Sequence, residues 1–489
     1  MPTEYVIYLS IPGLRPRDVT RDQTPTLHAW AGAGALADLV PTFPCVTSPV
    51  QATQWTGAGP DVHGVIANGF YHRDRGVVEF WVGRNGVVGG EQIWDAIRPR
   101  RPGFTSAVWH AQNIKDCAAD FIITPAPIHE ADGTTRLWCY SKPDGLYQEM
   151  RGELGHFPLQ HYWGPLSNIE SSRWILSGAS RLIARHAPNL HWIYLPHLDY
   201  AAQKFGPDSP QAQASLTELD QELARFADGV AESEIGGRVV FVAAGEYAMT
   251  DVSGVIYPNL LLREAGLLKV RKEDGAEQID LAGSAAFAMV DHQFAHVYLG
   301  ETSKRRNVET SKRRQQATGN GQQGRTAEGS VRSGRQAPAL GRPGVSSAQL
   351  LERTLDVFQS IPGLTVYAGD DRAKIGMNHP RSGEIVLVCD ESHWLAYYWW
   401  FEDAKAPAYA RTVDIHRKPG FDPVELFFDP KTKSIPLDAT LVKGSHGAPA
   451  TSAHQHAALI SSAATRHIES GKTYRDTDIK AMTLGLLMD

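Results

Sequence analysis

The sequence has few of the features typical of disulfide-rich, membrane or polyanion-binding proteins. It contains only four cysteines among 489 residues, none in a Cys-x-x-Cys spacing, so neither a disulfide framework nor a thiolate metal site is expected. No run approaches the roughly 20 apolar residues of a membrane span. The net charge of −6 gives no general attraction to nucleic acid or anionic lipid. We therefore expect no membrane partner and no nucleic-acid partner.

The first ten residues also lack the pattern of an export signal, because they carry neither a basic segment nor a long apolar segment. A cytoplasmic protein is expected from this start. The hydrophobic content of 42%, by contrast, is enough to fill a large core. The length allows one large domain with insertions or two to three smaller domains.

Short β-branched runs alternate with longer amphipathic runs along most of the chain. The short runs predict buried strands and the longer runs predict helices. Together they predict an α/β fold with a doubly wound, mostly parallel sheet flanked by helices. The predicted strands are 5–9, 106–109, 191–195, 239–243 and 286–290, and the predicted helices are 25–36, 171–187, 209–231, 258–265 and 347–361.

Residues 302–345 differ in kind from the rest of the chain. A Thr-Ser-Lys-Arg-Arg segment occurs twice there, and Gly, Gln, Ser and Arg dominate the remainder. Such a composition buries too little apolar surface to offset chain entropy, so it predicts a disordered basic insertion. Nucleic-acid binding by its lysines and arginines is an alternative. We expect 1–300 and 346–450 to form one discontinuous domain, followed by a partly helical tail, 451–489.

The segment around Thr47 has the pattern of a helix start. Ser48 is a good N-cap residue and Pro49 suits the first helical position. Thr47 would then lie where free backbone N–H groups and the positive end of the helix dipole meet an anion such as a phosphoryl group. On these residues alone, a capped helix with no catalytic role is the more ordinary alternative.

Polar residues follow several of the predicted strands at their carboxyl ends, where doubly wound sheets bind their ligands. They are found at 196–199, 245–247, 291–292 and 444–447. We expect these four segments to gather around one site.

The run from Thr47 to Gly57, with His63 and Gly64 after it, resembles the nucleophile segment of the alkaline phosphatase superfamily. Within it, the likeness is to type I phosphodiesterase/nucleotide pyrophosphatases, because Thr47 has the family's spacing to Thr56-Gly57. The resemblance covers 4–300 and 347–447. It implies an alkaline-phosphatase-like fold and a divalent metal, zinc or alternatively manganese. It also implies that Thr47 attacks a small phosphorylated substrate, which would be a phosphate ester, phosphodiester or nucleotide pyrophosphate.

The resemblance also implies ligands for the first of two family ions. In the two-zinc members an Asp, a His four residues later and a distant His hold this ion. Here Asp199 matches the Asp and His446 matches the distant His, whereas Gln203 replaces the nearer His. Two of the three ligands are present.

The ligands of the second family ion depart further from the pattern. The early Asp is replaced by Pro12, which has no side-chain donor, and the Asp-His pair is replaced by Glu246-Tyr247. Glu246 can ligate a metal, but a tyrosine is a poor ligand at its usual pKa. A complete second site is not expected.

A single ion is the remaining arrangement, although the number of ions stays open. Asp199, Glu246, His292 and His446 would suit one zinc or manganese ion. For His292, a packed polar residue near the core is an equal alternative. For His296, that alternative is the favoured interpretation.

Four further residues are candidates for substrate contacts. The family places an Asn near the nucleophile, and Val50 falls at that position, so Gln51 would replace the Asn only with a shift. Asn68 is a turn residue that could also face the substrate. Gln203 and Tyr247, at substituted ligand positions, complete the set.

These substitutions leave two functions open. The first is a metal-dependent hydrolase with Thr47 as nucleophile. The alternative is a non-hydrolytic or biosynthetic binding protein on the same scaffold with a degenerate metal site.

Overall fold

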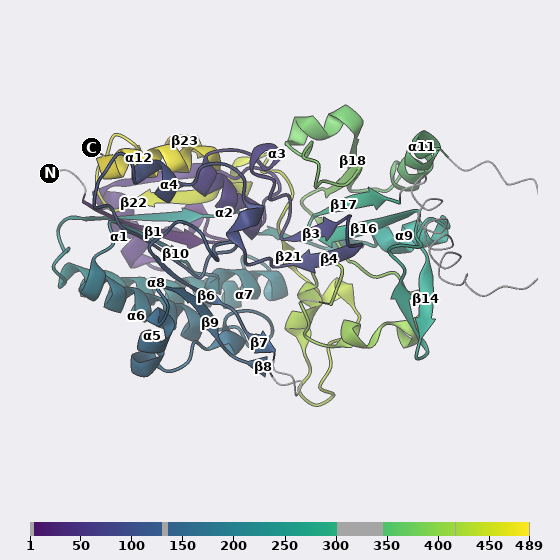
Figure 1. The fold of residues 1–489 in the computed structure, drawn as a ribbon, viewed down its shortest axis with the longest axis horizontal. Helices are drawn as coiled ribbons and strands as arrows, with labels where there is room; N and C mark the ends of the chain where they lie inside the picture. Colours follow the sequence, from purple (N-terminus) through teal and green to yellow (C-terminus); the bar gives the residue numbers. More distant parts are fainter. Residues whose placement is uncertain (1–3, 130–134, 301–345, 416, 489) are drawn as a thin grey trace, which may run out of the picture.

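The computed structural model describes residues 4–129, 135–300, 346–415 and 417–488. The predicted insertion at 302–345 lies outside the described residues. Figure 1 shows two parts side by side: a large sheet flanked by helices, and a smaller sheet near β14, α9 and α11. Within the described part of the chain, no helix has the length and apolarity that crossing a bilayer requires.

The larger part is built on a nine-stranded sheet that is mostly parallel. Its middle strands β11, β1, β10, β5 and β6 run parallel, while β22 and β9 run antiparallel to their neighbours. The predicted fold class is thereby confirmed. In spatial order the strands are β23 (Thr473–Arg475), β2 (Ala35–Val40), β22 (Ala457–Ser461), β11 (Val239–Gly245), β1 (Tyr5–Ile11), β10 (Leu190–Tyr194), β5 (Ser106–Trp109), β6 (Phe121–Pro125) and β9 (Cys139–Lys142).

Helices cover both faces of this sheet, which is why its middle strands are apolar on both sides. Figure 1 shows α6 and α8 below the sheet and α4 and α12 above it. The α-helices of the described residues, of which α9 and α11 lie beside the smaller sheet, are α1 (Pro25–Ala33), α2 (Thr47–Thr56), α3 (Pro60–His63), α4 (Ile93–Ile97), α5 (Leu146–Leu154), α6 (Ile169–His186), α7 (His197–Phe205), α8 (Pro210–Ala231), α9 (Pro258–Glu264), α11 (Ser347–Phe358) and α12 (Ile479–Met488).

Local sequence signals set the bounds of the long helices. The Ser209 side chain accepts a hydrogen bond from the Ala212 N–H, and Pro210 begins α8. The predicted helix at 25–36 ends earlier than expected, at Ala33, because Gly34 follows and the chain then enters β2. The other four predicted helices lie within three residues of their observed bounds.

The smaller part contains a four-stranded antiparallel sheet with its own hydrophobic core. Its strands are β16 (Ala286–Asp291), β17 (Phe294–Leu299), β19 (Ile385–Cys389) and β18 (Leu364–Ala368), in this order. The expectation that 286–290 joins the parallel sheet is therefore wrong. A two-residue turn pairs β16 directly with β17, and an apolar run reads alike in either kind of sheet.

Short strand pairs complete the fold. They are β3 (Gly69–His72) with β4 (Val77–Phe80), β7 (Ile128–His129) with β8 (Thr135–Arg136), β12 (Thr250–Asp251) with β21 (Gly444–Ser445), β13 (Gly254–Ile256) with β20 (His393–Leu395), and β14 (Val270–Glu273) with β15 (Ala276–Ile279).

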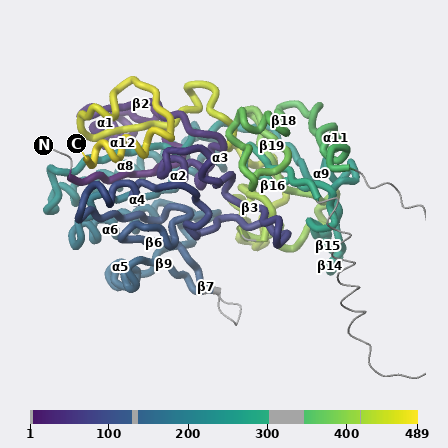
Figure 2. Tube along the Cα trace, turned by 45° about the horizontal axis from the view of Figure 1, so that its top comes forward, coloured from purple at the N-terminus to yellow at the C-terminus, as the bar shows by residue number. Residues whose placement is uncertain are grey.

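The C-terminal tail contains the expected helix, α12, and also adds β22 and β23 to the central sheet. Figure 2 shows this yellow segment lying over α1 and β2 from the other end of the chain. Because β22 pairs with both β2 and β11, the tail is an integral part of the sheet.

Asp476, in the tail, holds the segment that leads into α2. Its carboxylate accepts hydrogen bonds from the Thr42 N–H at 2.8 Å and the Thr42 hydroxyl at 2.5 Å. Burial raises the pKa of Asp476 to about 7, whereas the carboxyl group of an unfolded Asp has a pKa of about 4. Between these two pH values the folded protein keeps the Asp476 proton and the unfolded chain loses it. The free energy of unfolding therefore falls as the pH rises towards the folded pKa.

We expect Asp476→Asn to flatten this dependence on pH. Between about pH 5 and 6, the free energy of unfolding of the unmodified protein should fall relative to that of the variant by about 1.4 kcal/mol per pH unit. Urea denaturation of both proteins at several pH values measures the difference. Parallel pH profiles would contradict the assignment.

Candidate active site

Thr47 is the first residue of α2, and its side chain lines a cavity. The N-cap is Val46, in an extended conformation, so the prediction of Ser48 as the N-cap is wrong. The reason is tertiary: the Asn68 side-chain oxygen accepts a hydrogen bond from the Ser48 N–H at 3.0 Å and caps the helix from a distant loop. Thr47 nevertheless lies at the helix N-terminus, as the sequence predicted.

Asn68 also ties α2 to the end of β16 in the smaller part. Its N–H donates to Asp291 Oδ2 at 2.7 Å, and its side-chain amide donates to Asp291 Oδ1 at 3.2 Å. His292 Nδ1 lies 2.7 Å from the same Oδ1. All three residues are buried, and the Asp291 carboxylate holds Asn68 and His292 together by accepting hydrogen bonds from both.

The cavity has a volume of about 330 Å³ and is lined by residues from both parts of the molecule. Each of the four polar segments that follow predicted strands contributes a residue to the cavity wall. The sequence-predicted site residues on its wall are Thr47, Asn68, Asp199, Gln203, Tyr247, His292 and His446.

A chain of hydrogen bonds links Thr47 to Asp199 through Tyr247. The Tyr247 hydroxyl lies 3.2 Å from Thr47 Oγ1 and donates to Asp199 Oδ1 at 3.2 Å. Since that proton goes to the carboxylate, the Thr47 hydroxyl is the donor to the Tyr247 oxygen. Gln203 donates to the other Asp199 oxygen at 2.8 Å. Burial raises the pKa of Asp199 to about 7 and holds that of Tyr247 well above its ordinary value.

His446 lies next to the hydrogen bonds that link Thr47, Tyr247 and Asp199. Its Nδ1 is 2.7 Å from the Cys45 carbonyl oxygen, which can only accept, so Nδ1 carries the proton. Nε2 faces Asp199 Oδ1 at 3.9 Å and has no hydrogen-bond partner within the described ranges. The imidazole stacks on the Tyr247 ring, with centroids 3.6 Å apart and planes 6° apart. Burial lowers the pKa of His446 well below its ordinary value, so the ring is neutral.

Glu246 and Gln51 lie behind Thr47, not on the cavity wall. Glu246 Oε1 accepts from the Ser10 hydroxyl and from the Gln51 amide, both at 2.7 Å. The Gln51 carbonyl accepts from the Gln112 N–H at 2.8 Å. Burial raises the pKa of Glu246 to about 8. Gln51 therefore supports Glu246 instead of facing the substrate. Ser10 was not predicted, although a polar residue near the end of an apolar strand was the available signal.

These residues do not fit the two-ion pattern of the family. The described residues include no group of three His, Cys, Asp or Glu side chains that could hold an ion. Of the predicted set, Glu246 lies behind Thr47, whereas His446 lies near both other residues: its Nε2 is 3.9 Å from Asp199 Oδ1 and its ring centroid is 4.0 Å from that of His292.

His296 is a packed core residue, the interpretation that the sequence favoured. His296 is fully buried and contacts the Ile66 carbonyl oxygen at 3.1 Å. All four cysteines are buried and free.

The remaining cavity wall includes a buried cation and several aromatic residues. Lys418, also on the wall, is buried and bonded to Asp422 at 2.8 Å and Glu425 at 2.6 Å, so two carboxylates already neutralise this cation. The aromatic wall residues beyond Tyr247 are Phe80, Trp81, Tyr162, Trp163, Tyr194, Tyr200 and Phe421.

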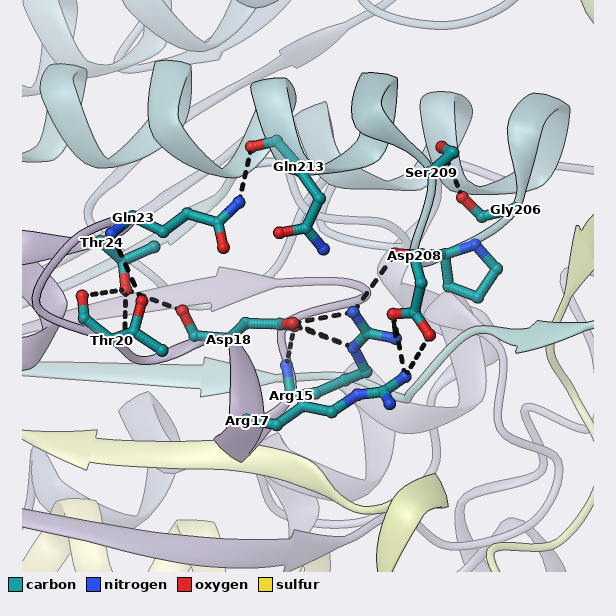
Figure 3. A network of polar contacts seen from close by, with 11 residues as sticks. Arg15, Arg17, Asp18, Thr20, Gln23, Thr24, Gly206, Asp208, Ser209 and Gln213 are labelled. Carbon is teal, nitrogen blue, oxygen red and sulfur yellow. Dashed lines mark hydrogen bonds and ion pairs between the residues drawn. The ribbon is translucent and has the colours of Figure 1, made fainter.

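Buried Arg15 fixes the loop that follows β1. Figure 3 shows its guanidinium between Asp18, at 2.7 Å, and Asp208, at 2.9 Å. Arg17 reaches the same Asp208 from a side chain that is 54% exposed. The network therefore joins the loop after β1 to the start of α8.

We expect Arg15→Met to lower the free energy of unfolding by about 3–5 kcal/mol, because the substitution leaves the buried Asp18 carboxylate without its partner. The matched control Arg17→Met removes an exposed pair and should cost less than about 1 kcal/mol. Urea denaturation measures both changes. Equal losses for the two variants would contradict the buried role of Arg15.

The mostly parallel sheet, with Thr47 at a helix N-terminus beyond its strand ends, is the fold of the alkaline phosphatase superfamily. The chain belongs to the type I phosphodiesterase/nucleotide pyrophosphatase family, whose pattern matches residues 6–422.

Curated relatives carry names of the same kind. An uncharacterized pyrophosphatase/phosphodiesterase of Schizosaccharomyces pombe is 24% identical over 51% of this chain and 45% of its own length. Human ectonucleotide pyrophosphatase/phosphodiesterase family member 7 is 23% identical over 47% of this chain and 44% of its own length. The chain thus spans less than half the length of these relatives.

Solved structures share the fold across nearly the whole chain. Murine ectonucleotide pyrophosphatase/phosphodiesterase 5, inactive and in complex with AMP, has a TM-score of 0.59 at 15% identity, covering 99% of this chain and 95% of that one. Phosphonoacetate hydrolase from Sinorhizobium meliloti, in complex with phosphonoformate, has a TM-score of 0.58 at 16% identity, covering 99% and 96%.

Proposed function

We propose that the protein hydrolyses phosphodiester or pyrophosphate bonds of a small phosphorylated substrate, with the Thr47 hydroxyl as nucleophile. One observation carries the proposal: Thr47 lies at the first position of α2 and faces the cavity. The helix dipole favours a phosphoryl group at this end. The family and the names of the relatives support the same reaction. AMP and phosphonoformate in the related structures support a small substrate.

The reaction would proceed in two steps. The Thr47 oxygen bonds to phosphorus while the P–O bond to the leaving group breaks, and the leaving group departs with that electron pair. The Thr47 proton passes to the Tyr247 oxygen while the Tyr247 proton passes to the Asp199 carboxylate, which holds it until the second step. Water then attacks the phosphothreonine, which releases the second product and restores the Thr47 hydroxyl.

The sequence-predicted zinc or manganese ion stays a prediction. Asp199 and His446 are the residues that would hold such an ion, which would supply Lewis-acid polarisation of a phosphoryl oxygen. The cytoplasmic location also stays a prediction.

Trapping the covalent intermediate tests this proposal. The protein is mixed with excess bis(p-nitrophenyl) phosphate, quenched in acid, digested and analysed by mass spectrometry. We expect a phosphoryl-ester adduct on the peptide that contains Thr47. Turnover with an adduct on a different residue would contradict the assignment.

The second candidate is a phosphate-ester binding protein without hydrolysis. It is favoured by Pro12 and Tyr247 at positions where the family pattern has ligands. This candidate predicts saturable binding of a nucleotide such as AMP, measured by calorimetry, with no adduct and no turnover. An adduct on Thr47 would eliminate it.

A further inference from the structure

We infer that the Tyr247 hydroxyl takes the place of the second family ion beside Thr47, so that the centre holds at most one divalent ion. The hydroxyl oxygen is 3.2 Å from both Thr47 Oγ1 and Asp199 Oδ1. It therefore fills the space between the nucleophile and the carboxylate. This inference concerns the occupancy of the site and does not depend on the proposed reaction.

The donors around this position cannot hold a cation. A zinc ion needs three or four donors at about 2.0–2.3 Å, with imidazole, thiolate or carboxylate preferred. Pro12 offers no side-chain donor. Glu246 Oε1 is already shared by Ser10 and Gln51, so only its Oε2 has no hydrogen-bond partner among the described residues, and one carboxylate oxygen falls short of three donors. A neutral phenol presents a proton, not a negative charge.

Packing holds the Tyr247 ring in this position. The ring stacks on His446 with centroids 3.6 Å apart, and Tyr247 is 1% exposed. The Tyr247 carbonyl accepts a hydrogen bond from the Gly13 N–H at 3.1 Å, which binds its backbone to the loop after β1. Arg15 anchors that same loop to Asp18 and Asp208 (Figure 3). The ring cannot leave this position without losing its stack on His446 and its two hydrogen bonds.

The hydroxyl also has a definite role beside Thr47. Because it donates to Asp199, it accepts from Thr47, and the Thr47 hydroxyl hydrogen is directed at the Tyr247 oxygen. The Thr47 lone pairs are then left for the ligand. A hydrogen bond thus provides the orientation that an ion provides elsewhere in the family, and Tyr247 is a positioning residue.

Counting ions in the purified protein tests the inference. The unmodified protein and its variants are equilibrated with zinc, passed through a desalting column and analysed by inductively coupled plasma mass spectrometry. We expect at most one tightly bound zinc per unmodified chain. The variant Pro12→Asp with Tyr247→His restores two family ligands, and we expect it to bind one additional zinc per chain.

Two control variants test whether an additional zinc ion comes from the restored family ligands. Tyr200→His adds an imidazole to the same cavity wall at a position that matches no family ligand, and we expect it to gain no zinc. Tyr247→Phe keeps the stacked ring without the hydroxyl, and we expect no gain there either. Circular dichroism checks that each variant is folded.

Two zinc ions per unmodified chain would overturn the inference, and this measurement needs no variant. A folded Pro12→Asp, Tyr247→His protein without the additional zinc would also overturn it. If no adduct forms on Thr47 but the zinc counts are as expected, the proposed reaction fails while this inference holds.

Discussion

Thr47→Ala is expected to lower kcat for a phosphodiester at least about 1,000-fold, because removing a covalent nucleophile removes the first bond-forming step. Binding should change little, since the cavity wall keeps its other residues. The loss should therefore fall on kcat and leave KM within a few-fold. Thr47→Ser retains a hydroxyl at the same helix position and should recover part of the rate. Steady-state kinetics with bis(p-nitrophenyl) phosphate measures these changes.

Thr56→Ala is the matched control for this experiment. Thr56 ends the same helix, and its hydroxyl donates to the Ala52 carbonyl at 2.7 Å instead of facing the cavity. We expect its kcat to stay close to that of the unmodified protein. If Thr47→Ala turned over as fast as Thr56→Ala, Thr47 would not be the nucleophile.

Asn68→Ala is expected to have the next largest effect, about a 100-fold loss of kcat. The substitution removes the cap on the Ser48 N–H and the amide bond to Asp291, so the start of α2 loses its attachment to the smaller part. A misplacement of about 1 Å at a reacting group can cost roughly this factor. The same change should lower the free energy of unfolding by about 1–3 kcal/mol, because buried polar groups lose their partners.

Asn189→Ala is the control for Asn68. The Asn189 amide likewise makes two hydrogen bonds, with the Thr105 N–H and the Glu4 carbonyl, but it precedes β10 at the opposite end of the strand from Asp199. We expect it to lose stability without a 100-fold loss of kcat. Kinetics and urea denaturation on both variants separate positioning from stability. Equal kcat losses would show that Asn68 acts through overall stability alone.

The sequence predicted where the strands end because each short apolar run marks the start and the end of one strand. β1, β5, β10 and β11 appear within two residues of their predicted bounds, and their exits carry Asp199 and Tyr247 to the cavity. Thr47 was readable for the same reason, since the local Ser-Pro pair marks a helix start even though Ser48 is not the cap.

The sequence did not predict which distant segments pair with each other in a sheet. The apolar run 286–290 fits a parallel or an antiparallel sheet equally well, and the tail strand β22 gave no distinct signal. Whether Gln51 faces the substrate or Glu246 depends on the rotation of α2, which the Gln51 partners Glu246 and Gln112 fix from other parts of the chain.

The sequence by itself determined the fold class, the helix that begins near Thr47 and the loss of family ligands at Pro12, Gln203 and Tyr247. These depend on residue type and on spacing along the chain, which local physics governs. Only the tertiary structure decided that the Tyr247 hydroxyl lies between Thr47 and Asp199, that Asn68 caps α2 and that Glu246 lies behind the nucleophile. Hydrogen bonds between residues 20 to 200 positions apart depend on how the strands pack, and no local pattern encodes that packing.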